Sequence, residues 1–229
     1  MTAVLVVGMH RSGTSCLTGC LQRAGLELGE VITWAPFNLR GNRESRVVMG
    51  LNEEVLRESG GAWDDPPEAV AWSEQTRARR DGYIDSMSIH ARWGFKDPRT
   101  LLTLDGWIEA LPDASTVGTY RHPEAVSRSL ASRSGMERAK AMKLWLAYNT
   151  RLLHLHRSSG TPIVCFDWER DRYLESVARL ARSLGLCAPD DVGDFYDAGL
   201  RNQMVSCDEE LPKDVSALLH ELDRSAARP

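Results

Sequence analysis

Short apolar runs alternate along this chain with longer segments in which apolar residues recur at helical spacing. The apolar runs predict strands at 4–7, about 92–95, 116–120 and 163–166. The periodic segments predict helices near 14–25, 44–58, 68–90, 122–133, 137–157, 171–184 and 213–223. Because strands that alternate with helices form mostly parallel sheets covered on both faces, we expect a three-layer α/β/α fold with a mostly parallel central sheet. No repeat or linker divides the sequence, so residues 1–229 are expected to form a single domain.

The first junction between a strand and a helix has the composition of a phosphate-binding loop, or P-loop. The apolar run Val4–Val7 leads into a turn that begins at Gly8 and contains Gly13, and the next helix starts near Thr14. In such a turn the backbone N–H groups of the loop and first helical turn point the same way, and the helix dipole adds positive charge. We therefore expect a phosphorylated ligand here, although a glycine- and serine-rich turn before an ordinary helix has the same local pattern.

The cation in this loop is placed differently from that of a nucleotide triphosphatase. The G-x-x-x-x-G-K-[ST] loop has a lysine directly after its second glycine, and this lysine reaches the outer phosphates. Here Gly8 and Gly13 have the right spacing, but Thr14 stands at the lysine position and the cation is Arg11. This difference counts against ATP hydrolysis and phosphoryl transfer.

A second candidate phosphate contact follows the strand predicted at 116–120. Arg121 closes this strand, and Ser129 lies on the helix that comes next. An arginine provides a planar fork for phosphate oxygens, and a helical hydroxyl adds a short donor. Ser127 and Arg128 lie nearby, so spacing alone does not decide which residues share the ligand with Arg121.

A third candidate lies at the end of the strand predicted near 92–95. Lys96 ends this strand, and Pro98 prevents a helix from continuing through Asp97. Ligands bind at the carboxyl ends of strands in open α/β sheets, so Lys96 is a candidate ligand contact. A surface ion pair, between Asp97 and either Lys96 or Arg99, is the alternative interpretation.

In their order along the chain, these segments resemble the sulfotransferases that use 3′-phosphoadenosine 5′-phosphosulfate (PAPS). Residues 11–15, Arg-Ser-Gly-Thr-Ser, resemble their 5′-phosphosulfate loop, and Arg121 with Ser129 matches the pair that holds the 3′-phosphate. Residues 96–98, Lys-Asp-Pro, and the Asn-x-x-Gly-x-x-Glu pattern of residues 38–44 are similar to segments of the tyrosylprotein and bacterial branches.

The resemblance implies transfer of a sulfonyl group from PAPS to a hydroxyl, or less readily an amine, of a small-molecule, carbohydrate or natural-product acceptor. The product would be adenosine 3′,5′-bisphosphate (PAP), and no metal is implied. The implied donor-binding residues are Arg11, Ser12, Gly13, Thr14, Ser15, Arg121 and Ser129. Glu44 corresponds in position to the carboxylate thought to act as base, with His10 or Lys96 as the alternative, while Arg11 and Lys96 would neutralise charge during transfer. Pro98 stands where cytosolic members have a catalytic histidine, and their Arg-Lys-Gly adenine loop is not recognisable.

Composition narrows the class of protein further. With 229 residues, of which 42% are hydrophobic and 26% are charged, the chain can bury one sizeable core. Its formal net charge of −4 argues against nucleic acid or an anionic membrane as partner, and no apolar run is long enough for a membrane span.

An odd number of cysteines without a C-x-x-C pair favours the reducing cytoplasm, and we find no metal-ligand spacing. The sequence does not indicate an oligomeric state.

Two other functions fit parts of the sequence. A P-loop small-molecule kinase would use the apolar run from Ile163 as a strand that ends in a magnesium-binding Asp167. A non-catalytic nucleotide-binding protein or scaffold would keep the fold without the reaction. Candidates for an aromatic acceptor cleft, or equally for the core, are Trp34, Phe37, Trp63 and Trp72.

Overall fold

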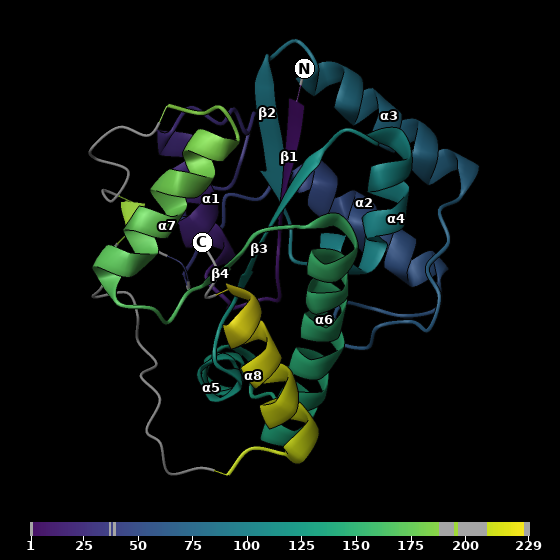
Figure 1. Ribbon diagram of the computed structural model, residues 1–229. Helices are drawn as coiled ribbons and strands as arrows, with labels where there is room; N and C mark the ends of the chain where they lie inside the picture. Colours follow the sequence, from purple (N-terminus) through teal and green to yellow (C-terminus); the bar gives the residue numbers. More distant parts are fainter. Residues whose placement is uncertain (1, 37, 39, 188–194, 197–209, 227–229) are drawn as a thin grey trace.

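One parallel sheet runs through the computed structural model, which describes residues 2–36, 38, 40–187, 195–196 and 210–226. In these ranges the sheet has four strands in the order β2-β1-β3-β4 (Figure 1). The strands are β1 (Thr2–Val7), β2 (Arg92–Lys96), β3 (Ser115–Tyr120) and β4 (Ile163–Cys165). All neighbouring strands are parallel, so their carboxyl ends meet at one edge of the sheet.

Helices cover both faces of this sheet. They are α1 (Thr14–Arg23), α2 (Arg46–Glu58), α3 (Glu74–Met87), α4 (Thr100–Ala110), α5 (Pro123–Ser134), α6 (Arg138–Ser159), α7 (Arg170–Ser183) and α8 (Lys213–Ala226). Side chains of β1 alternate between two cores: Leu5 and Val7 pack under α2, α4, α5, α6 and α8, while Val4 and Val6 pack under α1 and α7 (Figure 1). The predicted three-layer α/β/α fold with a parallel sheet is confirmed.

Helix α4 was not predicted from the sequence. Its residues are apolar on almost every side, so they show no amphipathic period. The structure explains this composition, because α4 is packed between α2, α3 and α6 and buries Trp107 completely. Gly106 lets the helix come close to Trp72, since a Cβ at this glycine would lie 2.2 Å from the indole Nε1 of Trp72.

Helix α3 begins later than the predicted start near residue 68. Ser73 is its N-cap, and the Ser73 hydroxyl accepts a hydrogen bond from the Thr76 backbone N–H at 3.2 Å. The preceding Trp72 turns its side chain into the core, and residues 66–73 are irregular, with bends at 68 and 69. In the described ranges, none of the helices combines the length and apolar composition that crossing a bilayer requires.

Candidate active site

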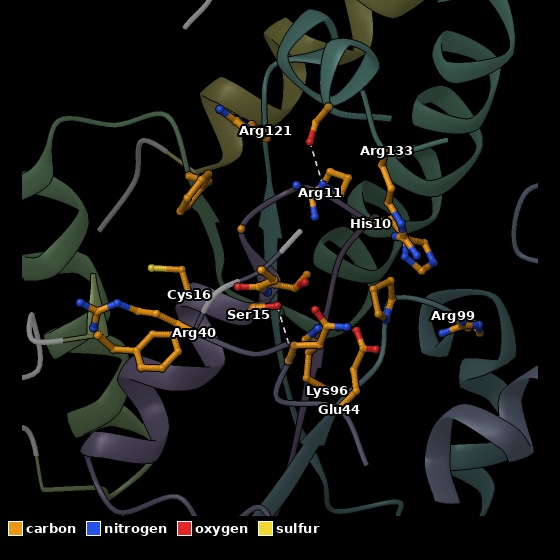
Figure 2. A pocket seen from close by; sticks show the side chains of 18 of the residues that line it. His10, Arg11, Ser15, Cys16, Arg40, Glu44, Lys96, Arg99, Arg121 and Arg133 are labelled. Atoms are coloured by element: carbon orange, nitrogen blue, oxygen red, sulfur yellow. Dashed lines mark hydrogen bonds and ion pairs between the residues drawn. The ribbon is translucent and has the colours of Figure 1, made fainter. Parts of the chain in front are cut away.

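A cavity of about 390 Å³ opens at the carboxyl edge of the sheet (Figure 2). Its wall includes the loop after β1, Lys96 at the end of β2 and Arg121 directly after β3. The charged residues of the described wall are one carboxylate and a surplus of cations, namely Glu44, Arg11, Arg40, Lys96, Arg99, Arg121 and Arg133. The cavity therefore favours a polyanionic ligand, although the chain as a whole has a net charge of −4.

The loop after β1 has the tight backbone that a phosphate-binding turn needs. Gly8 has a φ of +148°, and a Cβ there would lie 2.4 Å from the Thr119 carbonyl oxygen. Gly13 has a φ of +82° and would place a Cβ 2.3 Å from the ring of Phe166. The helical ladder of α1 starts with the Leu17 N–H, which donates to the Gly13 carbonyl at 3.0 Å. The backbone N–H groups of the first helical turn therefore donate no hydrogen bond within the helix, and they point along its axis toward the loop.

Two distant motif residues meet in the wall of the cavity. The Arg11 Nε donates to the Ser129 hydroxyl at 2.7 Å, although the two residues are 118 positions apart. Burial lowers the pKa of the Arg11 guanidinium, and the charges of Arg133 and Arg121 lower it further. Ser127, the other serine near this position, is buried and does not line the cavity. The geometry therefore groups Ser129, and not Ser127, with the loop.

Not every predicted loop residue turns its side chain to the cavity. Gly13, Thr14 and Ser15 line it together with Arg11. Ser12 is fully buried outside the lining, and its carbonyl accepts a hydrogen bond from the Thr119 hydroxyl at 3.1 Å. Ser12 thus ties the loop to β3, and its hydroxyl is buried without a hydrogen-bond partner among the described residues.

Arg121 is held in place by contacts on three sides. Its Nε donates to one Asp167 carboxylate oxygen at 3.1 Å, and the His122 backbone N–H donates to the other at 2.7 Å. The guanidinium lies over the Phe166 ring, 5.4 Å from its centroid. The indole N–H of Trp145 donates to the Arg121 carbonyl at 2.8 Å. The sequence had suggested Asp167 only as a magnesium ligand, whereas the structure shows it as the carboxylate partner of Arg121.

Glu44 and Lys96 form a buried ion pair. The Lys96 Nζ lies 2.6 Å from the Glu44 Oε1, and the residues are only 1% and 6% exposed. Two backbone hydrogen bonds join the Glu44 segment to Ile32: the Ile32 N–H donates to the Glu44 carbonyl, and the Arg43 N–H donates to the Ile32 carbonyl, both at 3.0 Å. Lys96 is fixed by the register of β2 against β1, in which it pairs with Val6. The two residues therefore reach the cavity from separate, well-anchored segments.

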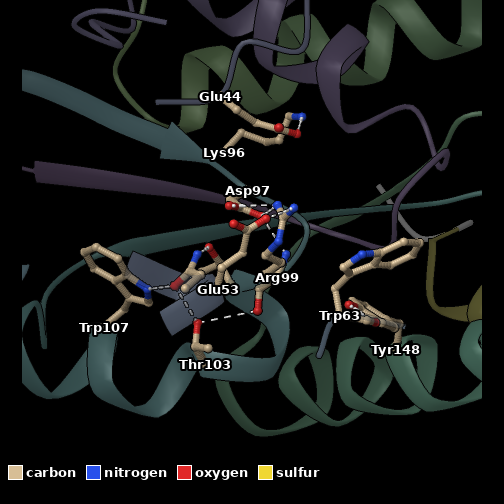
Figure 3. A network of polar contacts seen from close by, with 11 residues as sticks. Glu44, Glu53, Trp63, Lys96, Asp97, Arg99, Thr103, Trp107 and Tyr148 are labelled. Atoms are coloured by element: carbon tan, nitrogen blue, oxygen red, sulfur yellow. Dashed lines mark hydrogen bonds and ion pairs between the residues drawn. The ribbon is translucent and has the colours of Figure 1, made fainter. Parts of the chain in front are cut away.

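A second network, with Asp97 and Arg99 buried and Glu53 exposed, lies beneath this pair in Figure 3. The Arg99 Nη1 donates to Asp97 at 3.0 Å, and the Arg99 Nη2 donates to Glu53 at 2.7 Å. The sequence left open a surface ion pair of Asp97 with Lys96 or Arg99; the structure shows the Arg99 pair, and Asp97 is completely buried. The carboxylates of Asp97 and Glu53 thus compensate the charge of Arg99.

Asn52 joins this network to helix α4. Its Oδ1 accepts hydrogen bonds from the Thr103 hydroxyl at 2.8 Å and from the Trp107 indole N–H at 2.9 Å. Its Nδ2 donates to the Thr100 hydroxyl at 3.0 Å. Asn52 is fully buried, so these bonds fix α2 against α4 behind the wall of the cavity.

The aromatic residues proposed for an acceptor cleft have different positions. Trp63 packs on the His10 ring with 4.5 Å between centroids, and its carbonyl accepts a hydrogen bond from the Tyr148 hydroxyl at 2.9 Å. Trp34 is 63% exposed and does not line the cavity, and Trp72 belongs to the core beside Trp107. Phe37 lies outside the described residues. Of the described candidates, Trp63 alone stands next to a cavity residue.

Sequence reasoning missed Arg133 and gave His10 only a secondary part. Both line the cavity. Arg133 could have been found, because it lies four residues after Ser129 and therefore on the same face of its helix. No local pattern marks His10, whose position depends on the fold of the loop. Among the described residues, no group of three or more His, Cys, Asp or Glu side chains is arranged to hold a metal ion.

Comparison with known proteins extends this description. The family model described as "Sulfotransferase family" matches residues 3–168. The solved sulfotransferase domain from the Synechococcus PCC 7002 olefin synthase has a TM-score of 0.62 and 17% identity, over 96% of this chain and 94% of that one. The sulfotransferase domain from the curacin biosynthetic pathway has a TM-score of 0.61 and 12% identity, over 97% of each chain. At such identities the two structures show a shared fold, and no curated protein sequence matches the chain.

Proposed function

The chain belongs to the sulfotransferase family, and we propose that it moves a sulfonyl group from PAPS to a hydroxyl of a small-molecule, carbohydrate or natural-product acceptor. The observation that carries this proposal is the hydrogen bond between Arg11 and Ser129. It brings the loop after β1 and the middle of α5 to one wall of a cationic cavity, which would provide phosphate contacts for both ends of the donor.

The cavity residues fit a donor of this charge. PAPS carries a 3′-phosphate and a 5′-phosphosulfate, and the surplus of cations in the wall complements them. The first turn of α1 and the side chains of Arg11, Thr14 and Ser15 would hold the phosphosulfate. Arg121 and Ser129 would hold the 3′-phosphate. The tight approach of Gly13 to Phe166 leaves no room for a side chain and supports a backbone cradle in this loop.

The buried ion pair provides a base and a cation side by side. Bound PAPS would supply an activated sulfonyl group, whose transfer breaks the bond between sulfur and the bridging oxygen and leaves the electron pair on PAP. In the ion pair Glu44 is a carboxylate, the form that can take the acceptor proton while the acceptor oxygen forms its bond to sulfur. Lys96 would donate a hydrogen bond to the oxygen that gains charge, and Arg11 would stabilise the sulfonyl oxygens.

The structure favours this reaction over phosphoryl transfer by a kinase. A kinase would need Asp167 for magnesium and a lysine at position 14. The oxygens of Asp167 accept hydrogen bonds from Arg121 and from the His122 N–H, and position 14 is a threonine. Both solved domains are described as sulfotransferase domains, and one of them comes from the curacin biosynthetic pathway. This origin supports a natural product as the acceptor class.

A thermal-shift panel tests the proposal against its alternatives. The protein is heated with PAP, with ATP and magnesium, or with AMP at equal concentration. At a concentration of about 100 times the dissociation constant, a ligand stabilises the native state by about 2.7 kcal/mol, which raises Tm by several degrees. We expect PAP alone to give this shift. A shift with ATP and magnesium alone would support the kinase, and PAP binding without turnover of any acceptor would support a non-catalytic protein.

A further inference from the structure

One end of the cavity contains His10 and Arg133, which we call the His10 end. Figure 2 shows these two side chains together, on the side of the cavity away from Arg40 and Cys16. Trp63 packs behind His10. The donor contacts proposed above use Arg121 and the first turn of α1, so they leave the polar groups of the His10 end without an assigned ligand.

His10 is a buried histidine with free hydrogen-bonding capacity. Its side chain is 7% exposed, and its Nε2 is buried with no hydrogen-bond partner in the part of the chain that the structure describes. Its neighbours are rings, with Trp63 at 4.5 Å and Tyr148 at 6.3 Å between centroids. Burial lowers the pKa of His10 well below 6.5, and the charges of the nearby cations, in order Arg99, Lys96, Arg133 and Arg11, lower it further. The imidazole is therefore neutral and offers one donor and one acceptor.

Arg133 is a cation of the cavity wall for which the described residues provide no carboxylate partner. It lies in the last turn of α5, where a positive charge is favoured by the helix dipole, so its presence there alone indicates no ligand. Its side chain, however, lines the cavity, and no carboxylate pairs with it among the described residues. Arg99 and Arg121, by contrast, each have a carboxylate partner. The charge of Arg133 also lowers the pKa of Arg11, so two like charges are held in one cavity.

We propose that the His10 end binds an anionic oxygen group of the acceptor, a carboxylate or a phosphate, so that the substrate is a hydroxylated acid. An anion accepts hydrogen bonds only, and Arg133 and the imidazole N–H both donate them. Its negative charge relieves the repulsion between Arg133 and Arg11. Because the His10 end and the Glu44–Lys96 pair line the same cavity, an acceptor anchored by its anion would have its hydroxyl within the reach of Glu44. This inference rests on the proposed function.

Small probes test the His10 end without knowledge of the full acceptor. The enzyme is saturated with PAP and titrated with acetate, inorganic phosphate or acetamide, which is a neutral match for acetate in size. Histidine ring resonances are followed by NMR, and the variant His10→Gln assigns the His10 signal. We expect acetate and phosphate, but not acetamide, to shift this signal saturably. Arg133→Gln should weaken their binding about tenfold, as for loss of one charge-assisted contact. Arg128→Gln, on the same helix but outside the cavity wall, is the charge-matched control.

The remaining outcomes separate this inference from the proposed function. An equal response to acetamide, no saturable response, or anion binding that Arg133→Gln leaves unchanged would each overturn an anion site at the His10 end. If Arg133→Gln weakens PAP itself as much as Arg121→Ala does, Arg133 belongs to the donor site and the inference is wrong. Failure of the parent protein to bind PAP would instead contradict the proposed function.

Discussion

The two ends of the cavity differ in how their polar groups are held. At the end that contains the proposed contacts for PAPS, which we call the donor end, Arg11 is bonded to Ser129 and Arg121 to Asp167, at distances of 2.7 and 3.1 Å. At the His10 end, the His10 Nε2 has no hydrogen-bond partner and Arg133 no carboxylate among the described residues. The protein thus arranges the polar groups of the donor end in advance, whereas at the His10 end it leaves groups that the proposed anion would satisfy.

This difference has a physical meaning. Preorganised groups lose little freedom when they bind, which suits a ligand that is the same in every catalytic cycle. A buried polar atom without a partner has a desolvation cost, and a ligand that satisfies the atom removes this cost. The His10 end should therefore discriminate between acceptors, while the donor end should contribute affinity. Substitutions at these two ends, at the Glu44–Lys96 pair and in the network behind it are expected to differ in the size of their effects.

The largest effect is expected at the ion pair. Glu44→Gln keeps the shape of the side chain and removes its basicity, so turnover should fall by a factor of about 10² to 10⁴. PAP affinity should stay close to that of the parent, because the proposed donor contacts do not include Glu44. The measurements are the rate of PAP formation with an acceptor and calorimetric titration with PAP. If the Gln variant turns over at the parent rate, Glu44 is not the base and another group takes the proton.

The next effect concerns the donor end. Arg121→Ala should weaken PAP binding by about 2–4 kcal/mol, because a charge-assisted phosphate contact is lost. Binding of AMP, which has no 3′-phosphate, should hardly change. Calorimetric titration with both nucleotides measures the difference. Equal losses of affinity for PAP and AMP would mean that Arg121 does not contact the 3′-phosphate.

A third prediction concerns the support behind the ion pair. Asn52→Ala leaves the Trp107 N–H and two threonine hydroxyls buried without their partner, which should cost about 2–3 kcal/mol of unfolding free energy. Chemical denaturation measures this loss, with the exposed Arg57→Ala on the same helix as control. A loss no larger than that of the control would mean that the neighbouring hydroxyls find other partners.

The smallest effect follows from the lowered pKa of His10. In acid the unfolded chain binds a proton at this histidine and the native state does not, so stability falls as the pH drops below 6.5. This histidine lowers the unfolding free energy by at most about 1.4 kcal/mol per pH unit, and the loss stops once the pH falls below the pKa of His10 in the native state. His10→Asn removes it, so the difference in unfolding free energy between variant and parent should shift in favour of the variant between pH 6.5 and 5. A difference independent of pH would contradict a neutral, buried imidazole.

The sequence predicted most of the fold because its strands are short apolar runs between polar turns. It missed α4, whose apolar residues have no period because the helix is buried between other helices. Arg11 and Lys96 could be named from their places in the loop and at the strand end, Ser129 was named from the resemblance to the family, and all three line one cavity. Their roles stay predictions. The contact of Asp167 with Arg121 joins segments 46 positions apart, and no local pattern indicates such a contact.

The central position of β1 has a consequence for biosynthesis. β1 leaves the ribosome well before both of its neighbours: Thr2 pairs with Arg92, and Val4 pairs with Ser115. At about 5–20 residues per second, this apolar strand waits for several seconds before β2 has been made. Pairings so distant along the chain also slow folding. During this interval both edges of β1 are unpaired, so it is a segment on which a chaperone or an aggregating neighbour would act.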